Sequence, residues 1–193
     1  MSQELPARDR ILEATAELME RQGYFGTGLN EIIEHSKTPK GSLYHYFPDG
    51  KEEIAEVAIN RKSEMMQRKI SEHFSIVRDP AEAVRSLLLM MAQHARMVHC
   101  RKGNPLATVA LETANSSDRI REACVNAFES MRQLFHDKFV EGGISEEAAH
   151  RLATTCVASI EGAFVLVRTM QHAEPLETIA EVLYDMVKAE SPA

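Results

Sequence analysis

The stretch that most constrains the fold of this chain is TGLNEIIEHSKTPKGSLYHYFPDGK, residues 27–51, which reads as two short helices joined by a tight turn. Three apolar residues fall on one face at helical spacing and indicate the first helix: Leu29, Ile32 and Ile33. The hydroxyl of Thr27 is expected to cap this helix by accepting a backbone N–H of its first turn. The sequence therefore predicts a helix that begins just after Thr27 and ends near residues 35–36.

The second helix is predicted to begin at Thr38 and Pro39, a capping hydroxyl followed by a proline whose missing N–H costs nothing in a first turn. It runs to residue 46 or 47, where Pro48, Asp49 and Gly50 break the chain. Two short helices with a brief turn have the geometry of a helix-turn-helix, whose second helix enters the major groove of DNA by its N-terminal end. The stretch therefore favours a DNA-binding function.

The second helix carries groups that suit contact with DNA. Lys40 offers a cation, Gly41 allows a phosphate to approach the backbone, and Ser42 can face a base edge or a phosphate. Leu43 and Phe47 fit the inner face, and for Phe47 a core position is the better interpretation. The residues predicted to contact DNA are Thr27, Lys37, Thr38, Lys40, Gly41, Ser42, Tyr44, His45 and Lys51.

Charge limits how wide this contact can be. The net charge of the chain is −7, and residues 1–51 hold six Lys and Arg against eight Asp and Glu. A DNA-binding domain that stands alone is usually basic. The cations gather at one end, at Lys37, Lys40 and Lys51, so the sequence predicts a focused phosphate contact and not a broad basic surface.

These residues resemble the DNA-binding domain of the TetR family of bacterial transcriptional repressors. That family has a small capping residue, then Lys-Gly-Ser/Thr-Leu-Tyr, an aromatic run that ends in Phe, and Lys-Glu-Glu/Asp-Leu. The chain reads TPKGSLYHYF at residues 38–47 and KEEI at residues 51–54, and the resemblance covers roughly residues 8–60. The longer connection at residues 48–50 resembles the LmrA/YxaF-like subset. The resemblance implies a ligand-responsive repressor that binds a palindromic operator as a dimer.

The rest of the chain also reads as helices. Apolar stripes, caps and breaks predict an all-α protein of about nine helices with no convincing strand. Asp79 and Ser145 are the clearest predicted caps. We expect an N-terminal three-helix DNA-binding domain at residues 1–50, followed by a helical ligand-binding and dimerisation domain at residues 51–193.

The last two helices are apolar around much of their surface, with small residues at 158, 159, 162 and 163 that let another helix approach closely. A buried hairpin within one chain would explain this pattern. The alternative, which we favour, is a homodimer face. The resemblance implies dimerisation through these helices, and two recognition helices must lie about 34–36 Å apart on DNA.

A chamber for a small apolar or aromatic effector is predicted in the middle of the chain, where methionines and phenylalanines gather. An ordinary core is the alternative for each residue taken singly. Candidate polar anchors are His94, His99, Glu112 and Arg168. The predicted ligand-binding residues are Met90, Met91, His94, Met97, Cys100, Leu106, Val109, Phe128, Met131, Phe135, Phe164 and Arg168.

Cysteine usage leaves one further alternative open. The chain has three cysteines, an odd number without short spacing, which argues against disulfides and a zinc site. Cys100 precedes Arg101 and Lys102, and neighbouring cations can lower the pKa of a thiol. The alternative function is therefore a regulator that senses electrophiles or redox state through Cys100.

Other classes of protein are disfavoured by what the sequence lacks. It has a single Glu-x-x-His element, Glu147 to His150, where a di-metal carboxylate bundle needs two, and no glycine-rich phosphate motif. We therefore expect no catalytic residues, no metal and no cofactor. The absence of an apolar signal region or a long apolar run predicts a cytoplasmic protein without a membrane span.

Overall fold

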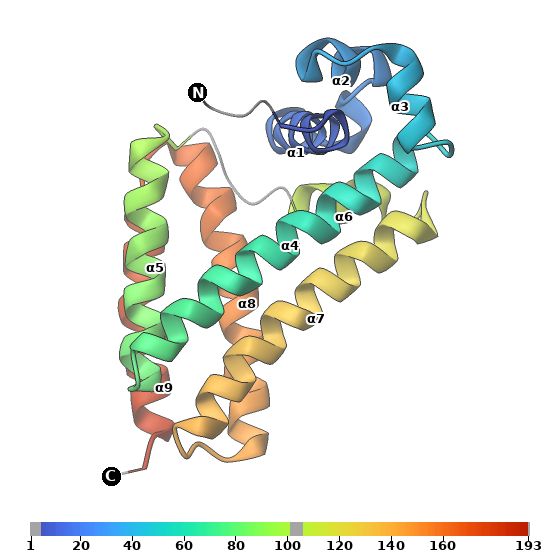
Figure 1. The fold of residues 1–193 in the computed structure, drawn as a ribbon. Helices are drawn as coiled ribbons and strands as arrows, with labels where there is room; N and C mark the ends of the chain where they lie inside the picture. Colours follow the sequence, from blue (N-terminus) through green and yellow to red (C-terminus); the bar gives the residue numbers. More distant parts are fainter. Residues whose placement is uncertain (1–4, 101–105, 193) are drawn as a thin grey trace. The chain divides into compact units, whose positions relative to one another are not determined.

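The computed structural model describes residues 5–100 and 106–192, which form nine α-helices and no strand (Figure 1). The helices are α1 (Ala7–Gly26), α2 (Leu29–Ser36), α3 (Lys40–Tyr46), α4 (Lys51–Ile76), α5 (Pro80–Met97), α6 (Leu106–Thr113), α7 (Asp118–Glu141), α8 (Glu146–Met170) and α9 (Glu174–Glu190). The prediction of an all-α protein of about nine helices is confirmed.

The chain divides into two compact units, each assembled from two separate segments. Within the described residues, the first unit holds residues 5–64 and 106–127, and the second holds residues 65–100 and 128–192. The divisions therefore fall inside α4 and inside α7. The functional boundary expected between residues 50 and 51 does not coincide with either of them.

The first unit is built around α1, which packs against α2, α3 and α6. The inner face of α1 is apolar and buried, and Leu43 and Phe47 of the α3 region and Ile54 of α4 are buried as well. Regular helix is interrupted near the end of α1, where Gly23 adopts φ 76° and ψ −179°. This backbone conformation favours glycine, because a side chain would be strained there.

Two of the predicted helix caps are wrong. Helix α2 has no side-chain cap, and the hydroxyl of Thr27 instead donates to the carbonyl oxygen of Gly23 at 2.7 Å. Helix α3 has no side-chain cap either, and the hydroxyls of Thr38 and Ser36 lie 2.6 Å apart. Both threonines are buried, and each hydroxyl bonds to the helix before its turn and not to the one after it.

The second unit is a bundle formed by the end of α4, α5, the later part of α7, α8 and α9. Helix α9 packs against both α5 and α8. At the centre, the ring of Phe135 lies 5.3 Å from that of Phe74 and 6.2 Å from that of Phe139. The two predicted caps of this unit are confirmed, since Asp79 accepts the N–H of Glu82 and Ser145 that of Ala148.

Helix α8 is long and apolar enough to cross a membrane by length and composition alone, which the sequence analysis did not anticipate. A core helix passes the same test. One side of α8 is buried in the bundle at Cys156, Ile160 and Val167, whereas Val165 and Leu166 are exposed. The apolar character of α8 thus has two sources, a core face and an uncovered outer face.

Removing the cap of α5 is expected to destabilise the second unit. Asp79→Ala should lower the free energy of unfolding by about 1 kcal/mol, because the N–H of Glu82 loses an acceptor 2.8 Å away. The backbone hydrogen bond from Glu82 holds the pKa of Asp79 below its ordinary value, with a smaller contribution from Lys188. The stability that Asp79 contributes should therefore be complete above the pKa of Asp79 in the unfolded chain, about 3.9. It should be lost as the pH falls through the pKa of Asp79 in the folded protein.

Urea denaturation of wild type and variant at about pH 7 and about pH 3 measures this difference. Asp79→Asn is the matched control, because its amide oxygen can still accept the hydrogen bond but does not titrate. Equal unfolding free energies for wild type and Asp79→Ala at neutral pH would contradict the assigned role of the cap.

Candidate nucleic-acid interface

Helix α3 presents different chemistry on its two sides. Lys40, Tyr44 and His45 are exposed, and 43% of Tyr44 is accessible to solvent. Leu43 and Phe47 on the other side are 0% and 1% exposed. The first turn contains no acidic residue, and the ammonium of Lys40 lies 6.0 Å from the ring centroid of Tyr44. The outer side of α3 therefore presents a cation and polar aromatic side chains, and the first turn of the helix carries no carboxylate.

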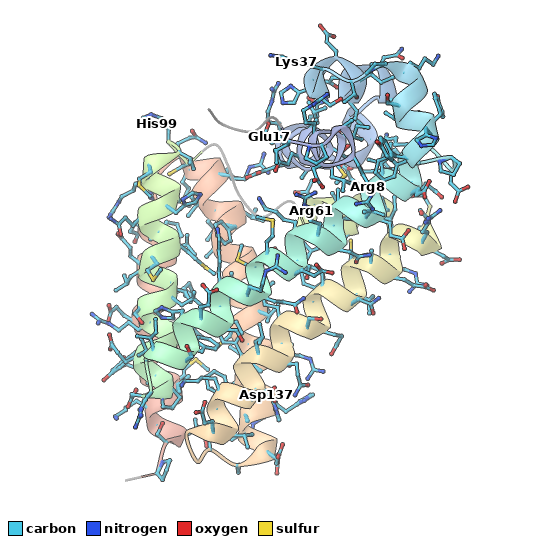
Figure 2. The ribbon with its side chains drawn as sticks, in the orientation of Figure 1. Arg8, Glu17, Lys37, Arg61, His99 and Asp137 are labelled. Atoms are coloured by element: carbon cyan, nitrogen blue, oxygen red, sulfur yellow. The ribbon has the colours of Figure 1, made fainter. Side chains whose placement is uncertain are left out.

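The turn between α2 and α3 is stabilised by an arginine that the sequence analysis did not single out. Arg10 of α1 donates from Nε to the carbonyl oxygen of Ser36 at 3.1 Å and from Nη2 to that of Lys37 at 3.5 Å. Lys37 itself is in the left-handed conformation with φ 51° and projects from the end of α2 (Figure 2). A helix end needs donors for its last carbonyls, but local sequence does not identify a donor from another helix.

Most of the predicted contact residues gather around α3. Lys37, Lys40, Gly41, Tyr44 and His45 are exposed, and Ser42 is partly exposed. Added atoms at Gly41 would meet nothing within 4 Å, so its backbone lies open. Thr27 and Thr38 are 1% and 4% exposed, which leaves neither side chain available at the surface.

Lys51 lies at the start of α4, where its ammonium is 4.1 Å from the ring centroid of Tyr24. Partial burial lowers the pKa of Lys51, and the nearby carboxylate of Glu112 opposes this shift. Burial also raises the pKa of Tyr24, and the charge of Glu52 adds to that effect. The lysine is thus positioned by an aromatic ring of its own unit.

The turn that follows α3 is held by an arginine from α7. Arg119 donates to Asp49 at 2.9 Å and to Glu56 of α4 at 2.5 Å. These two hydrogen bonds, followed by the charges of the same carboxylates, raise the pKa of Arg119. Asp49 lies in the turn that separates α3 from Lys51, and its charge is paired with Arg119 within the unit.

Glu112 of α6 does not occupy the place suggested for it as a ligand anchor. Its Oε2 accepts the backbone N–H groups of Tyr24 at 2.6 Å and Phe25 at 3.1 Å. Both donors lie at the end of α1, in the first unit. Helix α6 thereby contributes directly to the unit that carries α3.

Part of the predicted ligand chamber forms a buried cluster in the second unit. Met131 and Phe135 belong to its core, and Met91, Phe128 and Phe164 pack against that core while partly exposed. These five side chains come from three helices and share one apolar environment. They are the predicted ligand-binding residues that the structure brings together.

The other predicted ligand-binding residues lie outside the core formed around Met131 and Phe135. Met90 and Met97 are 55% and 66% exposed, and His94 is exposed on the same helix, α5. Cys100 is buried in a second, smaller cluster, against which Met91 and Phe164 also pack, and Arg168 is partly exposed. The remaining two, Leu106 and Val109, are buried residues of α6 in the first unit.

The thiols do not form disulfides in this structure. Cys100, Cys124 and Cys156 are all buried and free. Burial raises the pKa of Cys124 to about 11 and that of Cys156 to about 12, so both are protonated thiols at neutral pH. The two cations expected to act on Cys100, at positions 101 and 102, lie outside the described residues.

The two residues of the Glu-x-x-His element each contact a different arginine. Glu147 accepts from Arg151 at 2.7 Å, and the Nδ1 of His150 lies 2.9 Å from Arg132. Within the described part of the chain, no group of three or more His, Cys, Asp or Glu side chains could hold a metal ion. Glu147 and His150 are thus surface residues of α8 that each contact an arginine.

Comparison with known proteins shows the family to which the chain belongs. Residues 11–58 match the family described as bacterial regulatory proteins, tetR family, and residues 80–182 match the transcriptional regulator LmrA/YxaF-like C-terminal domain. The HTH-type transcriptional regulator LmrA of Bacillus subtilis (strain 168) is 36% identical over 182 residues, which cover 94% of this chain and 97% of LmrA.

Two further proteins are similar over nearly the whole chain. The uncharacterized HTH-type transcriptional regulator YxaF of Bacillus subtilis (strain 168) is 36% identical over 182 residues, covering 94% of this chain and 95% of YxaF. The crystal structure of regulatory protein TetR from Rhodobacter sphaeroides has a TM-score of 0.85 at 21% identity, covering 93% of this chain and 98% of that one, which shows a shared fold. The family consists of transcription regulators, so this protein is not an enzyme. The chain belongs to the TetR family of DNA-binding transcription regulators and carries an LmrA/YxaF-like C-terminal domain.

Proposed function

We propose that this regulator is a cytoplasmic repressor that binds a near-palindromic operator as a homodimer and is released by a small apolar or aromatic effector. The observation that carries the proposal is the outer side of α3. Lys40, Tyr44 and His45 are exposed there. Leu43 and Phe47 are buried on the inner side and hold the helix in place. A short helix held in this way can enter a major groove by its N-terminal end.

Dimerisation is proposed to occur through α8 and α9. Several large apolar side chains on these helices are exposed in the single chain: Val165, Leu166, Met170, Val182 and Met186. Exposed apolar groups of this kind are stabilised when another surface covers them. A bundle of helices from two chains would cover this face and bring two copies of α3 to one operator.

The effector is proposed to contact the cluster around Met131 and Phe135. Methionine and phenylalanine together form an adaptable apolar surface. An effector that binds one conformation of the dimer better than the operator-binding conformation must lower DNA affinity, and the operator must lower effector affinity by the same factor. Titrating an apolar or aromatic compound with and without operator DNA measures this coupling, and an effector affinity that operator DNA leaves unchanged would contradict the proposal.

Loss of the outer groups of α3 should weaken DNA binding without affecting the fold. Lys40→Ala and Tyr44→Ala are each expected to lower affinity about tenfold, within the range of about 1–3 kcal/mol for one DNA contact. Lys40→Ala should also reduce the slope of log affinity against log salt by about one, because one phosphate contact is lost. Fluorescence anisotropy in a salt series measures both quantities on a duplex selected by the wild-type protein from a random-sequence library.

The matched control is Lys62→Ala, which removes an exposed cation of the same unit on α4, well beyond α3 in sequence. It should change affinity by less than about twofold. Wild-type affinity in both α3 variants would show that α3 does not make the contacts proposed here. Failure of the wild-type protein to select any duplex would overturn operator binding itself.

A further inference from the structure

We propose that Glu112 is a positioning residue for DNA binding, which acts by holding the end of α1 and, through Tyr24, the side chain of Lys51. The inference rests on the proposed function, because it assumes that Lys51 contacts an operator phosphate. Glu112 lies on α6, 61 positions after Lys51 in the sequence, yet both belong to the first compact unit. Glu112 would affect DNA affinity through Lys51 and not through a contact of its own with DNA.

The carboxylate of Glu112 occupies a position that the backbone prepares for it. Gly23, with φ 76° and ψ −179°, interrupts α1, so the N–H groups that follow cannot continue the regular helical pattern. Such groups need an acceptor from elsewhere. Oε2 of Glu112 accepts the N–H of Tyr24 at 2.6 Å and that of Phe25 at 3.1 Å. A Cβ atom at position 23 would overlap this carboxylate, so the glycine also makes room for it.

The same carboxylate acts on the lysine at the start of α4. The backbone of Tyr24 is held by Glu112, and the ammonium of Lys51 lies 4.1 Å from the centroid of the Tyr24 ring. The negative charge of Glu112 also favours the protonated form of Lys51 and opposes the lowering of its pKa by burial. Glu112 therefore holds the backbone of the residue whose ring contacts Lys51, although it is itself remote from α3 in sequence.

Hydrogen bonds to a charged carboxylate are among the stronger ones in proteins. Without the carboxylate, the partly buried N–H of Tyr24 and the exposed N–H of Phe25 lose their acceptor, and the end of α1 is free to move together with Tyr24. The ammonium of Lys51 would then have no defined position from which to meet a phosphate. The loss is expected to appear mainly in DNA affinity, because the apolar residues that hold α1, α2 and α3 together remain in place.

The test compares Glu112→Ala, Glu112→Gln and Lys51→Ala in the full-length protein, with Leu111→Ala as the matched control. Leu111 is the neighbouring residue on α6 and is 83% exposed. The probe is again a duplex selected by the wild-type protein from a random-sequence library. Affinity is measured over a salt series, and circular dichroism with thermal unfolding shows that each variant is folded.

Glu112→Ala is expected to bind DNA about tenfold more weakly. Its slope of log affinity against log salt should fall by about one, because one phosphate contact is lost. Glu112→Gln should stay within about threefold of wild type, because the amide oxygen can accept the same two N–H groups. In the Lys51→Ala background, Glu112→Ala should have little further effect, since residues that act through one contact are not additive. Leu111→Ala should bind as wild type does.

Two results would overturn the positioning role and leave the proposed function intact. If Lys51→Ala weakens binding while Glu112→Ala does not, Lys51 contacts DNA without help from Glu112, and the proposed function stands alone. If Glu112→Ala weakens binding with an unchanged salt slope and adds fully to Lys51→Ala, its role is a general structural one. If wild type binds no duplex, or Lys51→Ala binds normally, the premise about DNA or Lys51 fails instead, and the positioning role fails with it.

Discussion

The double variant Leu166→Glu, Val182→Glu is expected to dissociate the proposed dimer and to lower operator affinity by about a hundredfold or more. Leu166 on α8 and Val182 on α9 are 45% and 46% exposed in the single chain. Covering them with a second copy would bury apolar surface, whereas a carboxylate at each position would have to be buried without a partner. Loss of the second half-site removes the gain of linked binding, which reaches about 10²–10⁴.

Sedimentation velocity gives the oligomeric state, and anisotropy on the selected duplex gives the affinity. The matched control is Ser71→Glu, Gln93→Glu, which adds the same charge at two exposed helix positions of the same unit, on α4 and α5. It should remain dimeric and keep its affinity within about twofold. A stable dimer in the Leu166→Glu, Val182→Glu variant would place the interface on another surface.

Phe47→Ala is expected to lower the stability of the first unit by about 3–5 kcal/mol, as for other large aromatic residues removed from cores. Phe47 is 1% exposed, and the guanidinium carbon of Arg8 lies 5.6 Å from its ring centroid. A whole domain is stabilised by only about 5–15 kcal/mol. The unit that presents α3 should therefore be partly unfolded at moderate temperature, and DNA binding should be largely lost.

Urea denaturation followed by far-ultraviolet circular dichroism measures the stability, and two transitions are expected if the units unfold separately. Tyr46→Ala is the control, because Tyr46 is adjacent in sequence but 41% exposed. Its effect on stability should be below about 1 kcal/mol. Equal stabilities for the two variants would show that Phe47 does not anchor the α3 region.

The helices could be predicted from local sequence because their signals are local. Apolar spacing predicted the inner face of α3, and the side chains of Asp79 and Ser145 cap α5 and α8 as expected. The expected caps at Thr27 and Thr38 failed for a reason that is not local. Each hydroxyl has a nearer partner in the preceding turn, and that choice depends on how the backbone bends there.

Only the packing of the helices shows which of the predicted ligand-binding residues face the core. Methionines at 90, 91 and 97 of α5 are equivalent in composition, yet Met91 packs against the core while Met90 and Met97 are exposed. Composition identifies the segment, but the rotation of a helix against its neighbours determines which side chains face inward. That rotation depends on packing against helices far away in the sequence.

The sequence by itself determined that this protein is helical and that residues 27–51 carry a DNA-binding element, because periodicity, chain breaks and surface chemistry act over a few residues. Only the tertiary structure decided which distant residues hold that element. Glu112 reaches Tyr24 across 88 positions and Arg119 reaches Asp49 across 70. Single charged side chains that find partners over such distances leave no periodic pattern, so the membership of α6 in the DNA-binding unit emerges only when the chain is folded.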